Sequence, residues 1–217
     1  MTAPVRAPGK APSGWLAITG LILLTALPVI GGVVRVRDVG AGATSSLPLP
    51  LTIAIVVHIV AMSLYCFVGA FQFSPALRAR RRWHRTAGRV LIPLGLAAAL
   101  AGVALVLLFH GPDDEYALAL VRLVFCIVMT VYLVLGAIAI VRRRFAAHGA
   151  WMTRAYAIGI AGGTQALLVT LFGLVVGDVD PVRETWLVAA GFFVNLAVAE
   201  WRNHRRLQLS RAPQQDG

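Results

Sequence analysis

Five polar residues lie within long apolar runs of the sequence, where water is scarce. They are His58, Tyr65, Arg122, Gln165 and Asn195. A charged arginine in such a run is costly and normally faces a partner or a watery cavity. We therefore predict an outer polar pocket in a helical bundle, in which Arg122 holds an anionic group and His58 gives or takes a proton.

Both central residues of this pocket also have a simpler interpretation. Arg122 lies near the end of its apolar run, so its side chain could extend to Asp113, Asp114 or Glu115, about two helical turns away. His58 could simply donate a hydrogen bond to a neighbouring helix, as most buried polar groups do. The sequence leaves both alternatives open.

A second group of polar residues lies at the start of two other apolar runs. Its members are His84, Arg85, Arg89, His148, Trp151 and Arg154. A helix N-terminus offers free N–H groups to an anion, and arginine adds paired donors suited to phosphate or carboxylate. We predict an inner anion site for a lipid head group or a phosphorylated metabolite. The alternative is that these side chains only anchor the helix ends among the lipid head groups.

The inner group also contains the only two histidines that the sequence places at matched depth. His84 and His148 could be the axial ligands of a b-type haem, which requires two facing imidazoles. His58 has no histidine at its own depth, and His110 lies about two turns shallower. Membrane electron transfer through haem on His84 and His148 is therefore a second functional hypothesis.

Recognisable catalytic motifs are missing from the sequence. It contains no GxSxG, HExxH or P-loop pattern and no paired carboxylates on an apolar run. Cys66 and Cys126 have no CxxC spacing, so we expect neither a disulfide framework nor a metal site. The sequence favours a non-enzymatic protein without catalytic residues.

Six apolar segments can hold these residues across a bilayer, which requires about 20 residues per helix. The segments are 15–36, 51–73, 88–109, 117–141, 153–176 and 185–200. The predicted fold is all-α, a six-span transmembrane bundle. We expect residues 1–14 to form an N-terminal tail, 15–201 the transmembrane domain and 202–217 a basic C-terminal tail.

The charges alternate between the gaps that separate these segments. Sixteen of the 20 Lys and Arg residues fall in 6–10, 78–89, 142–154 and 202–211, whereas seven of the nine acids lie in the other gaps. This alternation follows the positive-inside rule and predicts a multi-pass plasma-membrane protein with both termini in the cytoplasm. The pI of about 11.3 then reflects topology and anionic lipid rather than nucleic acid.

Two of the basic stretches look like copies of one another. Residues 80–89 and 142–154 each give an arginine triplet, an aromatic residue, a histidine and then another arginine five or six residues later. Spans two and three would then repeat as spans four and five. Sites in repeated membrane proteins often lie at the repeat interface.

From His58 onward, the pattern resembles an uncharacterised bacterial family of multi-spanning membrane proteins, domain of unknown function 2306. The resemblance is carried by His58, 69–73, His84-Arg85, Gly88-Arg89, His148, Trp151-Met152 and 154–156. A tyrosine that the pattern has after the Gly-Arg pair is Val90 here. The resemblance implies the architecture, a bacterial plasma (inner) membrane as the location and the choice of residues, but no reaction.

Three functional hypotheses follow. The first is non-enzymatic binding or transport of a small anionic ligand or lipid head group, the second is the haem protein, and the third is an assembly partner of a larger membrane complex. In the third, the small-residue faces of spans three and five would be the contacts.

One further acid lies at the inner end of the last span. Glu200 is followed closely by Arg202, Arg205 and Arg206, and we expect it to form a local ion pair with one of them.

Overall fold

The computed structural model describes residues 14–41, 47–108 and 116–211, and the regular secondary structure in these ranges is helical. The helices are α1 (Trp15–Gly40), α2 (Leu49–Phe71), α3 (Pro75–Ala79), α4 (Arg81–Leu108), α5 (Tyr116–Val141), α6 (Phe145–Gly159), α7 (Ala161–Val176) and α8 (Pro181–Arg211). Six helical units are long and apolar enough to cross a membrane. The predicted all-α, six-span bundle is confirmed. His110 and the acids 113–115 lie outside the described residues, as do the ends 1–13 and 212–217.

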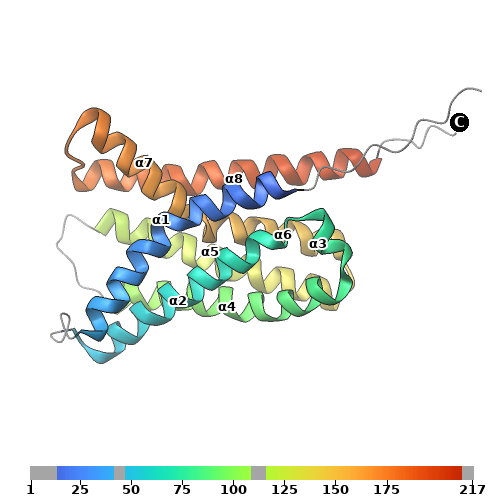
Figure 1. The fold of residues 1–217 in the computed structure, drawn as a ribbon, viewed down its shortest axis with the longest axis horizontal. Helices are drawn as coiled ribbons and strands as arrows, with labels where there is room; N and C mark the ends of the chain where they lie inside the picture. Colours follow the sequence, from blue (N-terminus) through green and yellow to red (C-terminus); the bar gives the residue numbers. More distant parts are fainter. Residues whose placement is uncertain (1–13, 42–46, 109–115, 212–217) are drawn as a thin grey trace, which may run out of the picture.

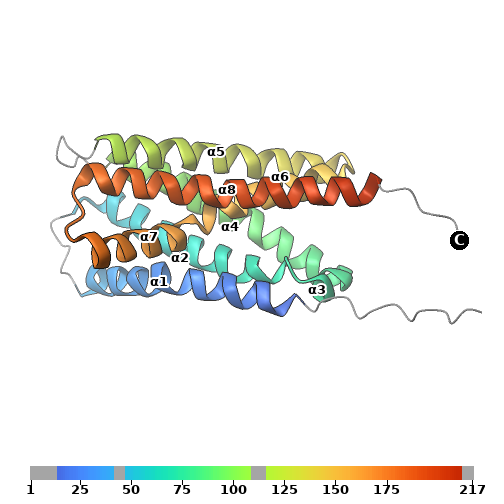
Figure 2. The same cartoon turned by 90° about the horizontal axis from the view of Figure 1, so that it is seen from above.

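The helices run along the long axis of the molecule and alternate in direction (Figures 1 and 2). One end of the bundle holds the start of α1, the short helix α3, the start of α6 and the end of α8, and we call it the termini end. The connections from α1 to α2, from α4 to α5 and from α7 to α8 lie at the other, far end. The basic stretches 78–89, 142–154 and 202–206 therefore gather at or near the termini end.

Two helical hairpins form the part of the bundle that the repeat predicted. α2 pairs with α4, and α5 pairs with α6. In each hairpin, a histidine just after the turn donates from Nδ1 to an oxygen twelve residues earlier: His84 to Gln72 Oε1, and His148 to the Gly136 carbonyl at 2.8 Å. The same local closure in both hairpins is consistent with two copies of one unit.

The fifth and sixth spans differ from their expected bounds. The fifth consists of two helices, α6 and α7, which meet at Ile160 and together cover Phe145–Val176. The sixth helix starts at Pro181 and continues to Arg211, well past the expected 185–200. Its extension is polar yet helical, because arginine, glutamine and leucine all favour helix and hydropathy marks only the apolar part.

The aromatic ring of Tyr65 lies where the two hairpins meet. Tyr65 on α2 is 4% exposed. A Cβ added to Gly95 would lie 2.8 Å from Tyr65 Cε2, and one added to Gly159 would lie 2.9 Å from Tyr65 Cε1. The two glycines are separated by the same interval in sequence as His84 and His148, so corresponding positions of the two copies hold opposite edges of one ring.

α1 crosses α7 at a close approach that requires a glycine. Pro28 lacks the N–H that would bond to the Leu24 carbonyl within α1, which leaves that oxygen free of its usual helical partner. A Cβ on Gly163 would lie only 1.9 Å from this oxygen. α1 can therefore pack against α7 and complete the wall of the cavities described below.

Candidate functional site

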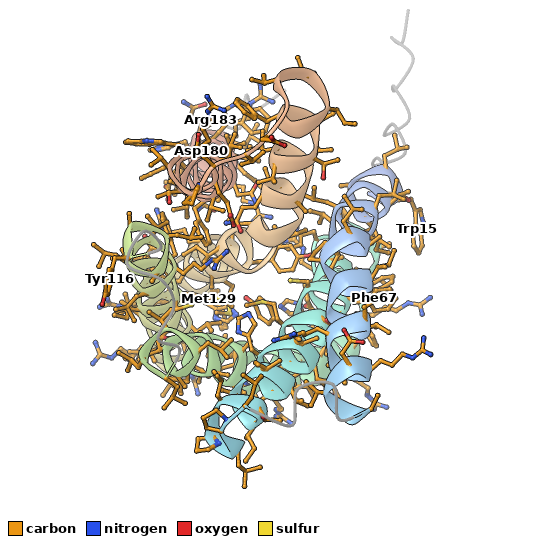
Figure 3. All side chains as sticks on the ribbon, turned by 90° about the vertical axis from the view of Figure 1, so that its left-hand side faces the viewer. Trp15, Phe67, Tyr116, Met129, Asp180 and Arg183 are labelled. Atoms are coloured by element: carbon orange, nitrogen blue, oxygen red, sulfur yellow. The ribbon has the colours of Figure 1, made fainter. Side chains whose placement is uncertain are left out.

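A cavity of about 460 Å³ lies within the bundle. Its walls come from all six spans, including Pro28 on α1 and Phe192 on α8. Figure 3 looks along the bundle from the far end and shows Met129, one of the lining residues, near its centre. The lining is mainly apolar, and His58, Arg122 and Gln165 bring polar groups to it. Three of the five residues predicted for the outer pocket therefore line one cavity.

His58 is fixed by a neighbouring helix and still faces the cavity. Its Nδ1 lies 2.8 Å from the Ala98 carbonyl on α4. A carbonyl oxygen only accepts, so Nδ1 carries a proton and donates it. Among the described residues, Nε2 has no such partner. Gly102 makes room for the ring, since a Cβ there would lie 3.3 Å from both Cε1 and Nδ1 of His58 and 2.6 Å from Cys126 Sγ.

Arg122 reaches across to the sixth span. Its Nη2 lies 3.4 Å from Glu184 Oε1 in the first turn of α8, and its side chain is 51% exposed. The acids expected to pair with it, 113–115, lie outside the described residues. Glu184 is 62 residues away in sequence, so local spacing gave no signal for this contact. Arg122 combines a half-exposed ion pair with a place on the cavity wall.

The remaining two residues of the predicted outer pocket lie elsewhere. Tyr65 is buried between the hairpins and is outside the cavity lining. Asn195 accepts a hydrogen bond from Thr164 at 3.0 Å and donates to the Ala157 carbonyl at 3.2 Å. It faces a second cavity of about 210 Å³ instead. Its amide connects α8 to α6 and α7.

At the termini end, the predicted inner group is only partly assembled. Arg154 donates from Nε and Nη2 to both carboxylate oxygens of Glu200, the latter at 2.7 Å, and its guanidinium lies 4.8 Å from the centre of the Trp151 ring. The expected local pairing of Glu200 is wrong. Side chains three or four residues apart face each other on a helix, and residues 202, 205 and 206 are not at those intervals from 200.

The two histidines of the inner group do lie near each other. His84 and His148 are close enough for an electrostatic interaction. Arg85 and Arg89 are exposed and make no described contact with the other members of the group. In the described part of the chain, no three His, Cys, Asp or Glu side chains form a possible metal-binding group.

Sequence reasoning missed several residues at this end. The Gln72 amide nitrogen is buried and has no hydrogen-bond partner among the described residues, although Oε1 of the same amide accepts from His84. Arg78, Arg202 and Arg206 also lie close enough to interact electrostatically. The Gln72–His84 contact has a sequence signal, because its twelve-residue spacing is repeated between Gly136 and His148. The three arginines have no such signal, because they come from helices that are distant in sequence.

Six apolar helices among the described residues, a cavity within the bundle and a strong charge asymmetry between the two ends define a polytopic α-helical membrane protein. The chain belongs to the DUF2306 family, described as predicted membrane protein, whose model matches residues 55–202. The match confirms the resemblance seen in the sequence and extends it from α2 into α8. No curated protein and no solved structure matches the chain.

Proposed function

We propose that the protein binds, and in the course of transport releases, an amphipathic organic anion in the 460 Å³ cavity. Small-molecule sites usually have about 300–1,000 Å³ and mostly apolar walls with a few polar groups. Here an arginine at the wall can hold a carboxylate or phosphate, and the apolar lining suits a hydrocarbon body. The observation that carries the proposal is the presence of His58 and Arg122 on one cavity.

The roles of the two residues differ. Arg122 is the anion-binding group, and Glu184 neutralises it in the empty state; a bound anion would compete with this carboxylate. His58 presents Nε2 to the ligand, as an acceptor when the ring is neutral and as a donor when it is charged. The Ala98 carbonyl holds its ring in place.

A direct test uses a fluorescent medium-chain carboxylate and its uncharged methyl ester, with the full chain in detergent. The carboxylate should bind more tightly than the ester, and Arg122→Gln should abolish this preference and weaken binding about tenfold or more, as expected for a charge-assisted contact. Arg183→Gln is the matched control, because Arg183 also pairs with an acid at the far end but is not among the residues that line the cavity.

Glu184→Gln separates ligand binding from a purely structural role. If Arg122 binds the anion, removing its competitor leaves affinity unchanged or raises it. If the ion pair only supports the fold, Glu184→Gln and Arg122→Gln weaken binding alike. That second result would refute the proposal, as would equal binding of carboxylate and ester.

The haem hypothesis remains a second candidate because of the hydrogen bonds of its two histidines. Imidazoles that bind metals usually donate their other N–H to an oxygen, and His84 and His148 both do so from Nδ1. Haem-replete protein should then show a Soret band that is lost in His84→Ala and His148→Ala and kept in His58→Ala. A purified, folded protein without a Soret band would exclude this candidate.

We also propose the plasma membrane as the location, with the termini end facing the cytoplasm. The support is the charge distribution. The arginines of 78–89, 142–144 and 202–206 gather at one end, and the acids Asp178, Asp180 and Glu184 lie at the other.

A further inference from the structure

Three arginines lie near one another at the termini end. Arg78 lies on the short helix α3, and Arg202 and Arg206 lie one turn apart on α8. Arg202 is close enough to interact with both of the others, and Arg206 interacts with Arg78. The Arg202 guanidinium packs 4.7 Å from the centre of the Phe73 ring. Arg206 lies beside Gly149, with Nη1 4.0 Å from where a Cβ on that glycine would be.

No acid in the described residues neutralises this arginine cluster. The ion pairs there are Arg122–Glu184, Arg154–Glu200 and Arg183–Asp180. Glu200, the nearest acid along α8, is taken by Arg154. Arg202 and Arg206 are only partly exposed, so water screens their mutual repulsion incompletely. Such an arrangement is favourable when an anion lies among the three charges.

The second cavity described above is a mostly apolar groove whose lining includes Arg202 of the cluster. The 210 Å³ cavity is lined by Leu21 and Leu24 of α1, by Val198 of α8 and by Phe73. Arg202 is the one charged side chain among the described residues that line it. A hydrocarbon chain in this groove would place its head group at the arginines. Free phosphate would make no use of the apolar walls.

We propose that Arg78, Arg202 and Arg206 bind the phosphate of an anionic phospholipid, whose acyl chain lies in the groove between α1 and α8. Paired N–H donors of arginine suit a phosphate diester. The Phe73 ring holds the Arg202 guanidinium beneath the head group through a cation–π contact. This site is separate from the cavity of the proposed function and does not depend on it.

The test is native mass spectrometry of the full chain, delipidated in detergent and titrated with phosphatidylglycerol. Phosphatidylcholine carries its phosphate in a head group without net charge. Inorganic phosphate has no acyl chain. We expect one tightly held phosphatidylglycerol, binding at least about tenfold more tightly than either of the others. Arg202→Gln/Arg206→Gln should remove this preference.

Arg205→Gln is the matched control. Arg205 lies on the same part of α8, is exposed and has its guanidinium 4.4 Å from the centre of the Trp201 ring rather than in the cluster. Arg205→Gln changes the net charge by the same amount as each single substitution in the cluster. This variant should leave phosphatidylglycerol binding within about twofold of the unmodified chain.

If the double variant does not fold, Arg78→Gln replaces it, because Arg78 is exposed on the short helix α3. It should weaken phosphatidylglycerol binding while Arg205→Gln does not. Equal losses in Arg78→Gln, Arg202→Gln and Arg205→Gln would mean diffuse attraction and would overturn the site. Equal affinity for inorganic phosphate would overturn the lipid assignment.

Discussion

The polar side chains of the bundle differ in how fully other helices have satisfied them. Asn195 uses both ends of its amide to join α8 to α6 and α7, and Arg154 is held by both oxygens of Glu200. His58 uses only one ring nitrogen. A residue whose hydrogen bonds are complete stabilises the fold. One with an uncommitted atom on a cavity can contact a ligand, which is why His58 and Arg122 carry the proposed function.

The Arg154–Glu200 pair should contribute measurably to stability because it is partly buried and uses two oxygens. Glu200→Gln removes the charge that compensates Arg154, and we expect a loss of about 1–2 kcal/mol in unfolding free energy. Denaturant unfolding in detergent measures it. Asp180→Asn, which breaks the exposed Arg183 pair, should cost less than about 0.5 kcal/mol. Equal losses would contradict a special role for the Arg154–Glu200 pair.

Hydropathy and spacing identified which residues were unusual, and the fold determined their partners. Arg122 and His58 were predictable because a charged or polar group within an apolar run is rare. The partner of Arg122 was not predictable, because Glu184 lies 62 residues further along the chain, on another helix, and only the packing of the helices brings the two together. Glu200 shows the same effect: three arginines are near it in sequence, and the one that it binds is 46 residues away.

At the scale of the helices, the Tyr65 ring lies between the hairpins and sets how closely α2, α4 and α6 approach one another. The ring has a glycine at each edge and also meets the Tyr156 ring, with centroids 5.9 Å apart. It cannot move away from one glycine without approaching the other. The repeat was visible in the sequence through its two basic loops, but the shared contact of its two copies with Tyr65 required the structure.

Gly159→Ala should therefore destabilise the bundle. The new Cβ would lie 2.9 Å from Tyr65 Cε1, and we expect a loss of about 1–3 kcal/mol from overpacking, seen as a lower Tm in detergent. Gly20→Ala on α1 is the control: nothing lies within 4 Å of its new Cβ, so stability should be unchanged or rise by up to about 1 kcal/mol.

A second substitution checks that Tyr65 is the cause. Adding Tyr65→Leu to Gly159→Ala replaces the ring with a smaller side chain, and the two changes together should cost less than the sum of their separate effects. Strict additivity would show that the alanine is destabilising for another reason.

The break between α6 and α7 was not predictable at this scale. Residues 153–176 form one apolar run without a proline, and hydropathy alone treats such a run as one helix. The structure interrupts it at Ile160, beside Gly159, Gly162 and Gly163. Small residues permit the close contacts with Tyr65 and with α1, and the change of helix direction follows from the packing.

At the scale of the whole molecule, the uneven distribution of charge is the feature that relates the two proposed sites. Arginines crowd the termini end, where the phospholipid is proposed to bind, and the far end carries the acids and Arg122. An anionic lipid would then be held from the cytoplasmic leaflet, and the larger cavity would take its ligand nearer the opposite face. Both assignments depend on the orientation of the chain in the membrane.

The orientation can be tested by labelling single cysteines in intact cells. In a chain with Cys66 and Cys126 replaced by alanine, Asp178→Cys lies at the far end and Gln208→Cys near the end of α8, both exposed. With the termini end in the cytoplasm, a membrane-impermeant maleimide should label the first in intact cells and the second only after permeabilisation. Labelling of Gln208→Cys in intact cells would show that the topology is the reverse of the proposed one. The arginine cluster would then face the outer leaflet, and the cavity with His58 and Arg122 would be nearer the cytoplasmic one.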